Sequence, residues 1–370
     1  MIRLAFRNLF QNKIRLVISV GGVALALLLV LSLDAVFTGV ERQVTAYIEH
    51  SGADVWVSQE DVRNMHMASS SLSDSVARKV KNVPGVLSVT PIHYLTNNVV
   101  AGNEQNLAYI IGLPENAQLG IPWIISSGRS LPGEGETIID RNVAEKSGIA
   151  LGDQVKILGK GFEVTGFSEG TASLVNSVAF ISMKDFEEMR GSYDTVSFLL
   201  VKVNEGESPE VVAARIQAQV RDVTAQTRND FAAQERQVVG DMSTDLITIM
   251  NLIGFLIGLA VMALTVYTST LSRRREYGML KALGARSADL YLTVLAQAIL
   301  SVILGFLFGL AITLLMTVVI PIFGSTLALE VSHASLLKVG SVSLIIAAVS
   351  AMLPIRQIAG LDPAMVFRGR

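Results

Sequence analysis

Residues 273–290, RRREYGMLKALGARSADL, decide the fold of this chain, because they form a charged segment between two long apolar runs. Residues 246–272 before this segment and 290–329 after it contain no charged residue. About 20 apolar residues are enough for a helix to cross a bilayer, so each run predicts a transmembrane span. Lys and Arg in short loops are retained on the cytoplasmic side. The sequence therefore predicts a short cytoplasmic helix that connects two spans.

The composition indicates a membrane protein with one polar insertion. The 370 residues have a mean hydropathy of +0.49 and 17% charged residues, too apolar for an ordinary soluble chain. The apolar residues gather in one run near the N-terminus and three near the C-terminus. The net charge of -2 gives no reason to expect nucleic-acid binding. The absence of cysteine excludes disulfides and thiolate metal sites.

The first apolar run, residues 16–33, allows two interpretations. A cleaved signal peptide also has a positive segment followed by an apolar run. This run is longer than the usual signal core, and no small-residue cleavage site follows it. We therefore predict an uncleaved first span, in which Gly21 and Gly22 allow another helix to approach closely.

The distribution of Lys and Arg predicts a plasma-membrane protein with both termini in the cytoplasm, because the N-terminus, the connector and the tail are all basic. The predicted fold class is a membrane protein with four transmembrane α-helices, one N-terminal and three C-terminal, plus an α+β extracytoplasmic domain inserted between the first and second spans. The segments are an amphipathic cytoplasmic interfacial helix (1–14), span 1 (15–38), the extracytoplasmic domain (39–240), a stalk with span 2 (241–272), the cytoplasmic connector helix (273–288), span 3 (289–321), an extracytoplasmic link (322–338), span 4 (339–355) and a cytoplasmic tail (356–370).

The inserted domain alternates short strand patterns with short helix patterns, which favours a mixed α+β fold. Strands are predicted at 54–58, 87–90, 108–112, 137–140, 154–158, 162–167, 178–181 and 196–203, and helices at 71–83, 142–147, 183–190 and 209–220. From residue 229 the pattern is helical again. Residues 246–272 alone make a helix of about 40 Å, against a hydrocarbon core of about 30 Å. We therefore expect this helix to project beyond the bilayer as a stalk.

No catalytic motif appears in the sequence. A phosphate-binding loop needs G-x-x-x-x-G-K-[ST], and residues 159–161, Gly-Lys-Gly, have the wrong spacing and are interpreted as a turn. The four histidines, His50, His66, His93 and His333, are far apart in sequence. We expect no enzymatic activity and no cofactor in this chain.

Three other features have a functional and a simpler interpretation. The segment 65–67, Met-His-Met, has ligand types that suit soft metals, but adjacent residues on regular structure cannot all face one ion, so we favour a loop and predict no metal. Asp34 could be an intramembrane functional carboxylate, although a position at the membrane interface is the simpler interpretation. The pair Glu187 and Glu188 is interpreted as a solvated helix face.

If the connector is helical, Tyr277, Leu280, Lys281 and Gly284 share one stripe of its surface. Small residues at 282, 284 and 285 would let a partner approach closely. An ordinary basic membrane loop explains the same charges. The residues alone leave both interpretations open.

A resemblance favours the first interpretation. Residues 275–285, REYGMLKALGA, resemble the R-x-x-E-[IY]-G-x-L-[RK]-A-[IL]-G-A signature of FtsX-like and MacB-like ABC permeases, with a Tyr where Ile is commoner. Residues 128–167 and 354–367 are also similar to segments of that family. In the family this signature forms the coupling helix, which docks on the ATP-binding subunit. The resemblance thus implies an ATPase-binding site made of Arg275, Glu276, Tyr277, Gly278, Leu280, Lys281, Ala282, Gly284 and Ala285.

The resemblance also implies the partners and the mechanism. The chain is expected to pair as a homodimer, to bind a separate cytoplasmic ABC ATPase that holds the ATP, to contact membrane lipids, and to engage an extracytoplasmic adaptor or hydrolase. ATP-driven movement of the connectors would pass through the stalks to the outer domains. The expected function is export of a lipophilic or peptide cargo by this mechanotransmission. The alternatives are a non-transporting transmitter that regulates an extracytoplasmic hydrolase, and a sensor.

Overall fold

The computed structural model describes residues 13–66, 69–102, 104–173, 176–322 and 327–359. The chain divides into two compact units. Unit 1 comprises Met1–Thr38, Ser243–Phe323 and Leu329–Arg370, and unit 2 comprises Gly39–Met242 and Gly324–Ala328. The predicted interfacial helix at 1–14 and most of the predicted tail lie outside the described residues.

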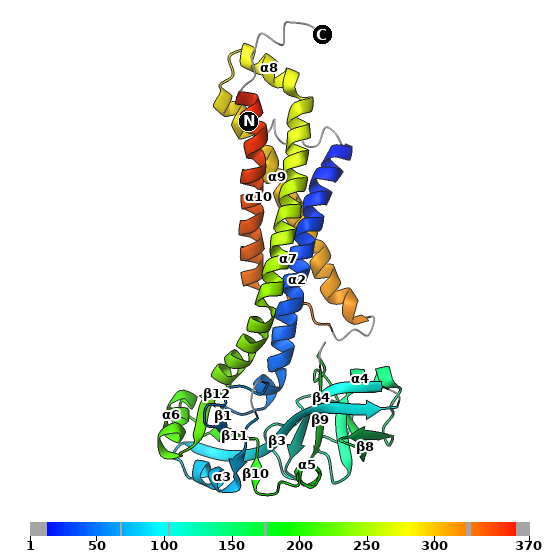
Figure 1. The fold of residues 1–370 in the computed structure, drawn as a ribbon, viewed down its shortest axis with the longest axis vertical. Helices are drawn as coiled ribbons and strands as arrows, with labels where there is room; N and C mark the ends of the chain where they lie inside the picture. Colours follow the sequence, from blue (N-terminus) through cyan, green and yellow to red (C-terminus); the bar gives the residue numbers. More distant parts are fainter. Residues whose placement is uncertain (1–12, 67–68, 103, 174–175, 323–326, 360–370) are drawn as a thin grey trace. The chain divides into compact units, whose positions relative to one another are not determined.

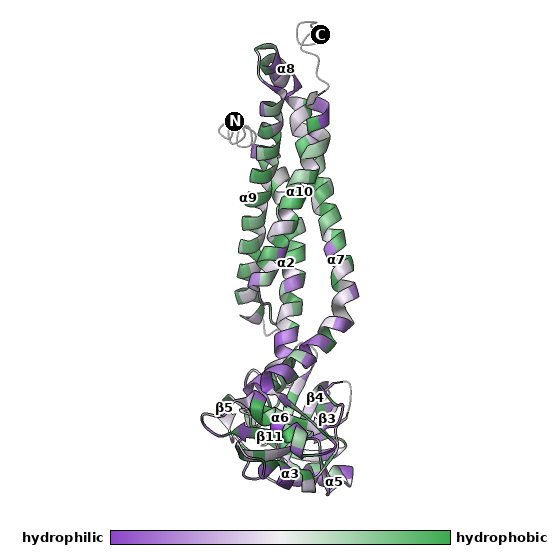
Figure 2. Ribbon diagram, turned by 90° about the vertical axis from the view of Figure 1, so that its left-hand side faces the viewer, coloured by the Kyte–Doolittle hydropathy of each residue, from purple (hydrophilic) through white to green (hydrophobic). Residues whose placement is uncertain are grey.

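Unit 1 is built from long apolar helices (Figure 1). They are α2 (Lys13–His50), α7 (Arg228–Ser272), α9 (Ser287–Ile322) and α10 (His333–Ala359), and α2 and α7 also supply residues to unit 2. Each contains a window long and apolar enough to cross a membrane, with a mean hydropathy between 2.1 and 2.7. Figure 2 shows the apolar residues along these helices. The prediction of four membrane-spanning helices, one N-terminal and three C-terminal, is confirmed.

Small residues let the helices of unit 1 pack closely, as membrane helices commonly do. A Cβ added to Gly22 of α2 would overlap Val261 of α7, and one added to Gly309 of α9 would lie 3.1 Å from the carbonyl oxygen of Ala24. The close approach predicted at Gly22 is therefore present, whereas a Cβ at Gly21 would meet no atom within 4 Å.

Two polar contacts also join the helices of unit 1. The amide of Gln297 on α9 donates a hydrogen bond of 2.9 Å to the hydroxyl of Ser269 on α7, and both residues are buried. Asp34 of α2 forms an ion pair of 3.0 Å with Lys338 of α10. The ion pair gives Asp34 a structural partner, which favours the simpler interpretation of this carboxylate.

Unit 2 contains a mixed sheet of ten strands in the order β12-β1-β11-β3-β4-β9-β6-β8-β5, with β7 paired to both β3 and β8, and a two-stranded sheet of β10 and β2. Four short helices accompany the sheets. The strands are β1 (Val55–Gln59), β2 (Leu72–Ser73), β3 (Val86–Ala101), β4 (Glu104–Leu113), β5 (Ile125–Gly128), β6 (Glu136–Asp140), β7 (Gln154–Ile157), β8 (Lys160–Ser168), β9 (Ser177–Ser182), β10 (Thr195–Val196), β11 (Phe198–Val203) and β12 (Val223–Thr227), and the helices are α3 (Asp74–Lys81), α4 (Arg141–Ser147), α5 (Met183–Arg190) and α6 (Pro209–Gln219).

The long strand β3 organises unit 2, because it pairs with β11, β4 and β7 along its length. Aromatic side chains fill the core beside it: Trp56 stacks on Phe231 of α7 at 4.9 Å and meets the edge of Tyr47 of α2 at 6.1 Å. Such aromatic pairs add to the free energy gained by burying apolar area. The α+β domain predicted between the first and second spans is confirmed.

Several element boundaries differ from the predictions. The structure adds β5 and β12, and it extends β3 from the predicted 87–90 to Ala101 despite Pro91. Pro354 was expected to end the fourth span, yet α10 continues through it to Ala359. The first helix runs to His50 rather than ending at residue 38. A proline inside a membrane helix is tolerated where neighbouring groups satisfy the freed carbonyl.

Candidate functional site

The connector between α7 and α9 contains one short helix, α8 (Arg274–Ala282). It begins directly after α7, at the turn residue Arg273, whose carbonyl accepts a hydrogen bond of 3.0 Å from the backbone of Tyr277. Asp289 lies in the first turn of α9, where its negative charge favours the positive end of the helix dipole. The connector is therefore a compact helix–turn segment and not an extended loop.

The end of α8 explains the Leu-Gly-Ala part of the connector motif. The backbone N–H of Ala285 donates to the carbonyl of Leu280 at 3.0 Å, and that of Gly284 donates to the carbonyl of Lys281 at 3.2 Å. This pair of hydrogen bonds is the Schellman ending of a helix, in which the residue after the cap adopts a left-handed conformation. Gly284 has a φ of +94°, a backbone conformation that is strained for a residue with a side chain.

The inner face of α8 is anchored by an aromatic residue. Tyr277 is 2% exposed and belongs to the same hydrophobic cluster as Val266 of α7 and Leu290 of α9, with Leu280 packed against this cluster. Burial raises the pKa of the Tyr277 hydroxyl, and this hydroxyl has no hydrogen-bond partner in the described part of the chain. An apolar side chain would suit the position equally well, which explains why Ile is common there in the family signature.

The outer face of α8 combines charge with exposed apolar area. Arg274, Arg275 and Glu276 are exposed in its first turn. Met279 is 53% exposed and Leu283 is 80% exposed. Met279 and Leu283 are four positions apart in the sequence, so both side chains lie on one face. Figure 2 shows the hydrophilic residues that surround α8.

The charged pair at the start of α8 contributes little to stability. Arg273 Nη1 lies 3.5 Å from Glu276 Oε2, and the Glu276 side chain is 63% exposed. The Arg273 side chain is only 10% exposed, but the carboxylate is solvated and the pair is long, so we expect it to contribute about 1 kcal/mol or less. Glu276 is thus available for a contact with another protein.

The structure separates the predicted site residues into three groups by their exposure to solvent. Arg275, Glu276, Ala282 and Gly284 are exposed, and Leu280, Lys281 and Ala285 are half-buried. Tyr277 and Gly278 are buried. Of the predicted stripe, Tyr277, Leu280 and Lys281 lie within α8 at the expected spacing, whereas Gly284 lies beyond the end of the helix. The helix itself ends at Ala282, not at 288, because the Schellman turn terminates it.

Two exposed residues of this face, Met279 and Leu283, were not among the predicted site residues. The signal that could have found them is their spacing: positions 276, 279 and 283 follow the three-and-four-residue pattern of one helix face.

Other predicted candidates lie in unit 2. His66 contacts the carboxylate of Glu235 through Nδ1, which gives this imidazole a protein partner. Among the described residues, no group of three His, Cys, Asp or Glu side chains could hold a metal ion, and Met67 is outside the described ranges. Glu187 Oε1 lies 3.5 Å from His93 Nε2 and is less solvated than predicted, whereas Glu188 pairs with Lys160 at the surface.

Two protein-family models together match most of the chain. Residues 16–219 match the MacB-like periplasmic core domain, and residues 248–363 match the FtsX-like permease C-terminal region. An uncharacterized ABC transporter permease of Mycobacterium bovis is 20% identical over 371 residues, covering 100% of both chains. One of Methanocaldococcus jannaschii is 24% identical over 399 residues, covering 100% of this chain and 97% of the relative.

Solved structures are similar to part of the chain. The periplasmic region of MacB from Actinobacillus actinomycetemcomitans matches with a TM-score of 0.38 and 14% identity, covering 50% of this chain and 94% of that one. The family matches extend over more than half of the chain and include both the inserted domain and the connector. The chain therefore belongs to the ABC transporter permeases that join a MacB-like periplasmic core domain to an FtsX-like permease region.

Proposed function

We propose that the outer face of α8, made of Arg275, Glu276, Met279, Ala282 and Leu283, is the docking surface for a cytoplasmic ABC ATPase. The observation that carries the proposal is the contrast between the two faces of this helix. Tyr277 fixes the helix to unit 1, while Met279 and Leu283 remain exposed. A buried apolar centre with a charged rim is the usual anatomy of a protein interface.

The proposed orientation follows from charge. The connector has three consecutive arginines, at 273–275, and further basic residues at 281 and 286. Such a short basic segment is retained in the cytoplasm. An ATPase that docks there meets the positive charges of the rim, and Glu276 supplies the one exposed acidic contact of α8.

Mechanotransmission is the mechanism we infer for the coupled movement. The helices α2 and α7 each continue without a break from an apolar span into unit 2. A continuous helix transmits an axial or tilting displacement better than a loop does, because its backbone hydrogen bonds resist local rearrangement. ATP-driven displacement of α8 would then reach unit 2 through α7, which ends directly before α8.

The proposed cargo is a lipophilic molecule or a peptide, exported from the outer leaflet or the extracytoplasmic space. One relative supports an export role: the pyoverdine export ATP-binding/permease protein of Pseudomonas fluorescens is 23% identical over 385 residues, covering 98% of this chain and 58% of that protein. The proposed assembly is a homodimer with one ATPase per permease, joined by an extracytoplasmic adaptor.

The docking proposal is tested with the ATPase that co-purifies with the chain from its host membranes. Leu283→Asp places a charge at the centre of the proposed interface, and we expect at least a tenfold loss of co-purified ATPase and of stimulated hydrolysis, about 1.4 kcal/mol or more. Leu151→Asp is the matched control, because Leu151 is an exposed leucine of unit 2 (45%). Equal ATPase binding by both variants would refute the docking surface.

A second candidate function is a transmitter that regulates an extracytoplasmic hydrolase and moves no cargo. The unbroken helices α2 and α7 favour it as much as they favour export. Deletion of the chain distinguishes the two functions. An exporter changes the efflux of its cargo and leaves wall hydrolysis as it was, whereas a transmitter does the reverse.

A further inference from the structure

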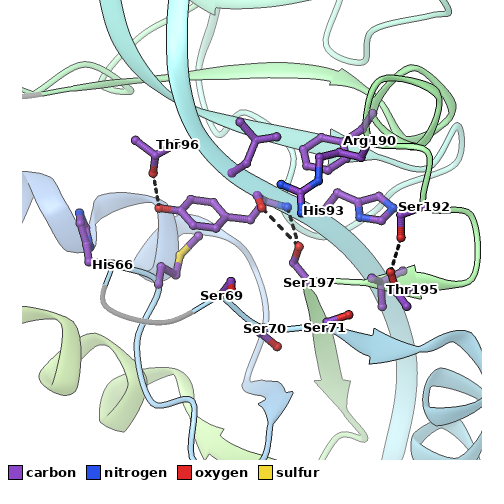
Figure 3. Close-up of a pocket in the computed structure, with 15 residues that line it drawn as sticks. His66, Ser69, Ser70, Ser71, His93, Thr96, Arg190, Ser192, Thr195 and Ser197 are labelled. Atoms are coloured by element: carbon purple, nitrogen blue, oxygen red, sulfur yellow. Dashed lines mark hydrogen bonds between the residues drawn. The ribbon is translucent and has the colours of Figure 1, made fainter. Parts of the chain in front are cut away.

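Unit 2 contains a cavity of about 390 Å³, formed by three stretches of the chain, residues 65–71, 93–96 and 186–197 (Figure 3). Its walls come from the loop before β2, the middle of β3, the end of α5, the turn after α5, and β10 with the residue that follows it. Small-molecule sites in proteins usually have volumes of roughly 300–1,000 Å³. The cavity is therefore large enough for a small organic ligand.

The cavity has a cation without a protein partner. Arg190, the last residue of α5, lines it and is exposed. In the described part of the chain, no hydrogen bond or ion pair engages its guanidinium. The lining residues include no carboxylate. An arginine in such a wall is suited to a carboxylate, which its planar fork can bind through two hydrogen bonds.

A second polar group in the wall is unsatisfied. His93 of β3 is buried, and its Nε2 has no hydrogen-bond partner among the described residues. Burial, and then the charge of Arg190, lowers the pKa of this imidazole to about 4, so the ring is neutral near pH 7. An unsatisfied buried polar group costs free energy. Nε2 is itself buried and lies 3.5 Å from Glu187 Oε1, so His93 contributes its neutral ring to the wall and not this nitrogen.

The rest of the wall mixes hydroxyl groups with apolar and aromatic side chains. Ser192 and Thr195 hydrogen-bond each other at 2.6 Å, and the Ser197 hydroxyl accepts a hydrogen bond of 3.0 Å from the backbone of Tyr94. The ring of Tyr94 and the ring of Phe186, which stacks on His93 at 4.6 Å, add aromatic surface. The wall thus combines the guanidinium of Arg190 with the aromatic surface of Tyr94 and Phe186.

The acidic residues behind the wall limit the charge of a ligand. Glu187 lies 3.5 Å from His93 Nε2, and burial together with Asp74 and Asp194 raises the pKa of Glu187. These carboxylates would repel a ligand with two negative charges more strongly than a ligand with one. From the cation, the hydroxyl groups and the aromatic surface, we propose that this cavity binds a small organic monocarboxylate with an aromatic body.

The proposal does not depend on the docking role of α8, because binding is measured without the ATPase. The full chain in lipid nanodiscs is titrated calorimetrically with N-acetyl-L-phenylalanine and with its uncharged amide, N-acetyl-L-phenylalaninamide. We expect the acid to bind the wild type with a Kd of about 1 mM or tighter. The amide should bind at least about tenfold more weakly, because it cannot form the charged pair with Arg190.

Two variants show whether binding is at this site. Arg190→Gln should weaken binding of the acid by about tenfold or more, and should leave little difference between acid and amide. Arg221→Gln, at an exposed arginine of unit 2 outside the cavity wall, is the matched control and should bind as the wild type does. Circular dichroism verifies that both variants are folded. Equal affinity of acid and amide, wild-type binding by Arg190→Gln, or no binding at about 10 mM would each overturn the proposal.

Discussion

The connector helix α8 and the cavity region of unit 2 differ in where they keep their ionisable groups. In α8 the charged residues Arg274, Arg275 and Glu276 are exposed, and the buried residue is a tyrosine that stays neutral. In unit 2 several titratable groups are buried, among them His93 in the cavity wall and Glu235, which is 0% exposed. Buried charge is costly and shifts pKa values, whereas exposed charge does neither strongly. We therefore expect pH to change the stability of unit 2, and apolar packing to determine the stability of the connector.

The largest expected effect is the loss of the aromatic anchor of α8. Tyr277→Ala removes a side chain that is buried in the cluster of unit 1, and we expect it to destabilise by about 3 kcal/mol or more. Tyr277→Phe is the matched control, since it removes only a hydroxyl without a partner among the described residues. Thermal unfolding in detergent measures both. If Tyr277→Ala unfolds at the wild-type temperature, the helix is not anchored by packing.

The second prediction concerns the pH dependence of unit 2. Burial raises the pKa of Glu235 from 4.5 to about 7. The folded state therefore prefers the protonated acid, and this stabilisation is fully present below pH 4.5 and lost as the pH rises through about 7. Glu235→Gln keeps a neutral acceptor for the backbone N–H of Met65, which donates to Glu235 at 2.7 Å. Relative to the wild type, this variant should gain up to about 3 kcal/mol at pH 8 and nothing near pH 4.

His66 opposes this trend, because burial lowers the pKa of its imidazole from 6.5. Its contribution is present above that value and lost as the pH falls. Because His66 contacts Glu235, the difference between Glu235→Gln and the wild type reports the titration of this coupled pair. Glu205→Gln, at an exposed residue of unit 2, is the control and should leave the pH profile unchanged. A Glu235→Gln profile parallel to that of the wild type would contradict the buried-acid interpretation.

The third prediction tests the turn after α8. Gly284→Ala places a side chain at φ +94°, and we expect a loss of about 1 kcal/mol, from strain alone, since a Cβ there would meet no atom within 4 Å. Gly21→Ala is the matched control, because its added Cβ would also meet no atom and α2 is helical there. The unfolding temperatures of the two variants, each compared with that of the wild type, measure the effect. Equal stability of the two variants would mean that the Schellman turn does not require glycine.

The smallest expected effect is that of the exposed charges of α8. Glu276→Gln should change the stability of the chain by less than about 0.5 kcal/mol, because the carboxylate that pairs with Arg273 at 3.5 Å is 63% exposed. The same variant should weaken ATPase binding, and more so at low ionic strength than at high. A large stability change with unaltered ATPase binding would assign Glu276 to folding instead of docking.

The two regions also show what a sequence can predict. The helical connector was predictable because its signals are local: residues 273–290 contain the basic cluster between two apolar runs, although the spacing of Met279 and Leu283 was overlooked. The buried position of Tyr277 was not predictable, because the core that covers it comes from α7 and α9. The spans were predictable from apolar length alone, although α10 continues through Pro354.

In unit 2 the strands with clear alternation were predicted within a few residues. The edge strands β5 and β12 were missed, because an edge strand has one unpaired side and a weaker apolar pattern. The extension of β3 beyond Pro91 was missed because proline usually argues against a strand interior. The cavity could not be predicted, since Arg190 and His93 are brought together by the pairing of β3 with its neighbours and by the position of α5.

The central claim, that the outer face of α8 is a cytoplasmic docking surface, is tested most directly by a single cysteine. The chain has no cysteine, so Leu283→Cys provides one exposed thiol. A membrane-impermeant maleimide should label it in inverted vesicles but not in intact cells, and bound ATPase should protect it. Labelling from outside intact cells, or labelling that the ATPase does not reduce, would contradict the account.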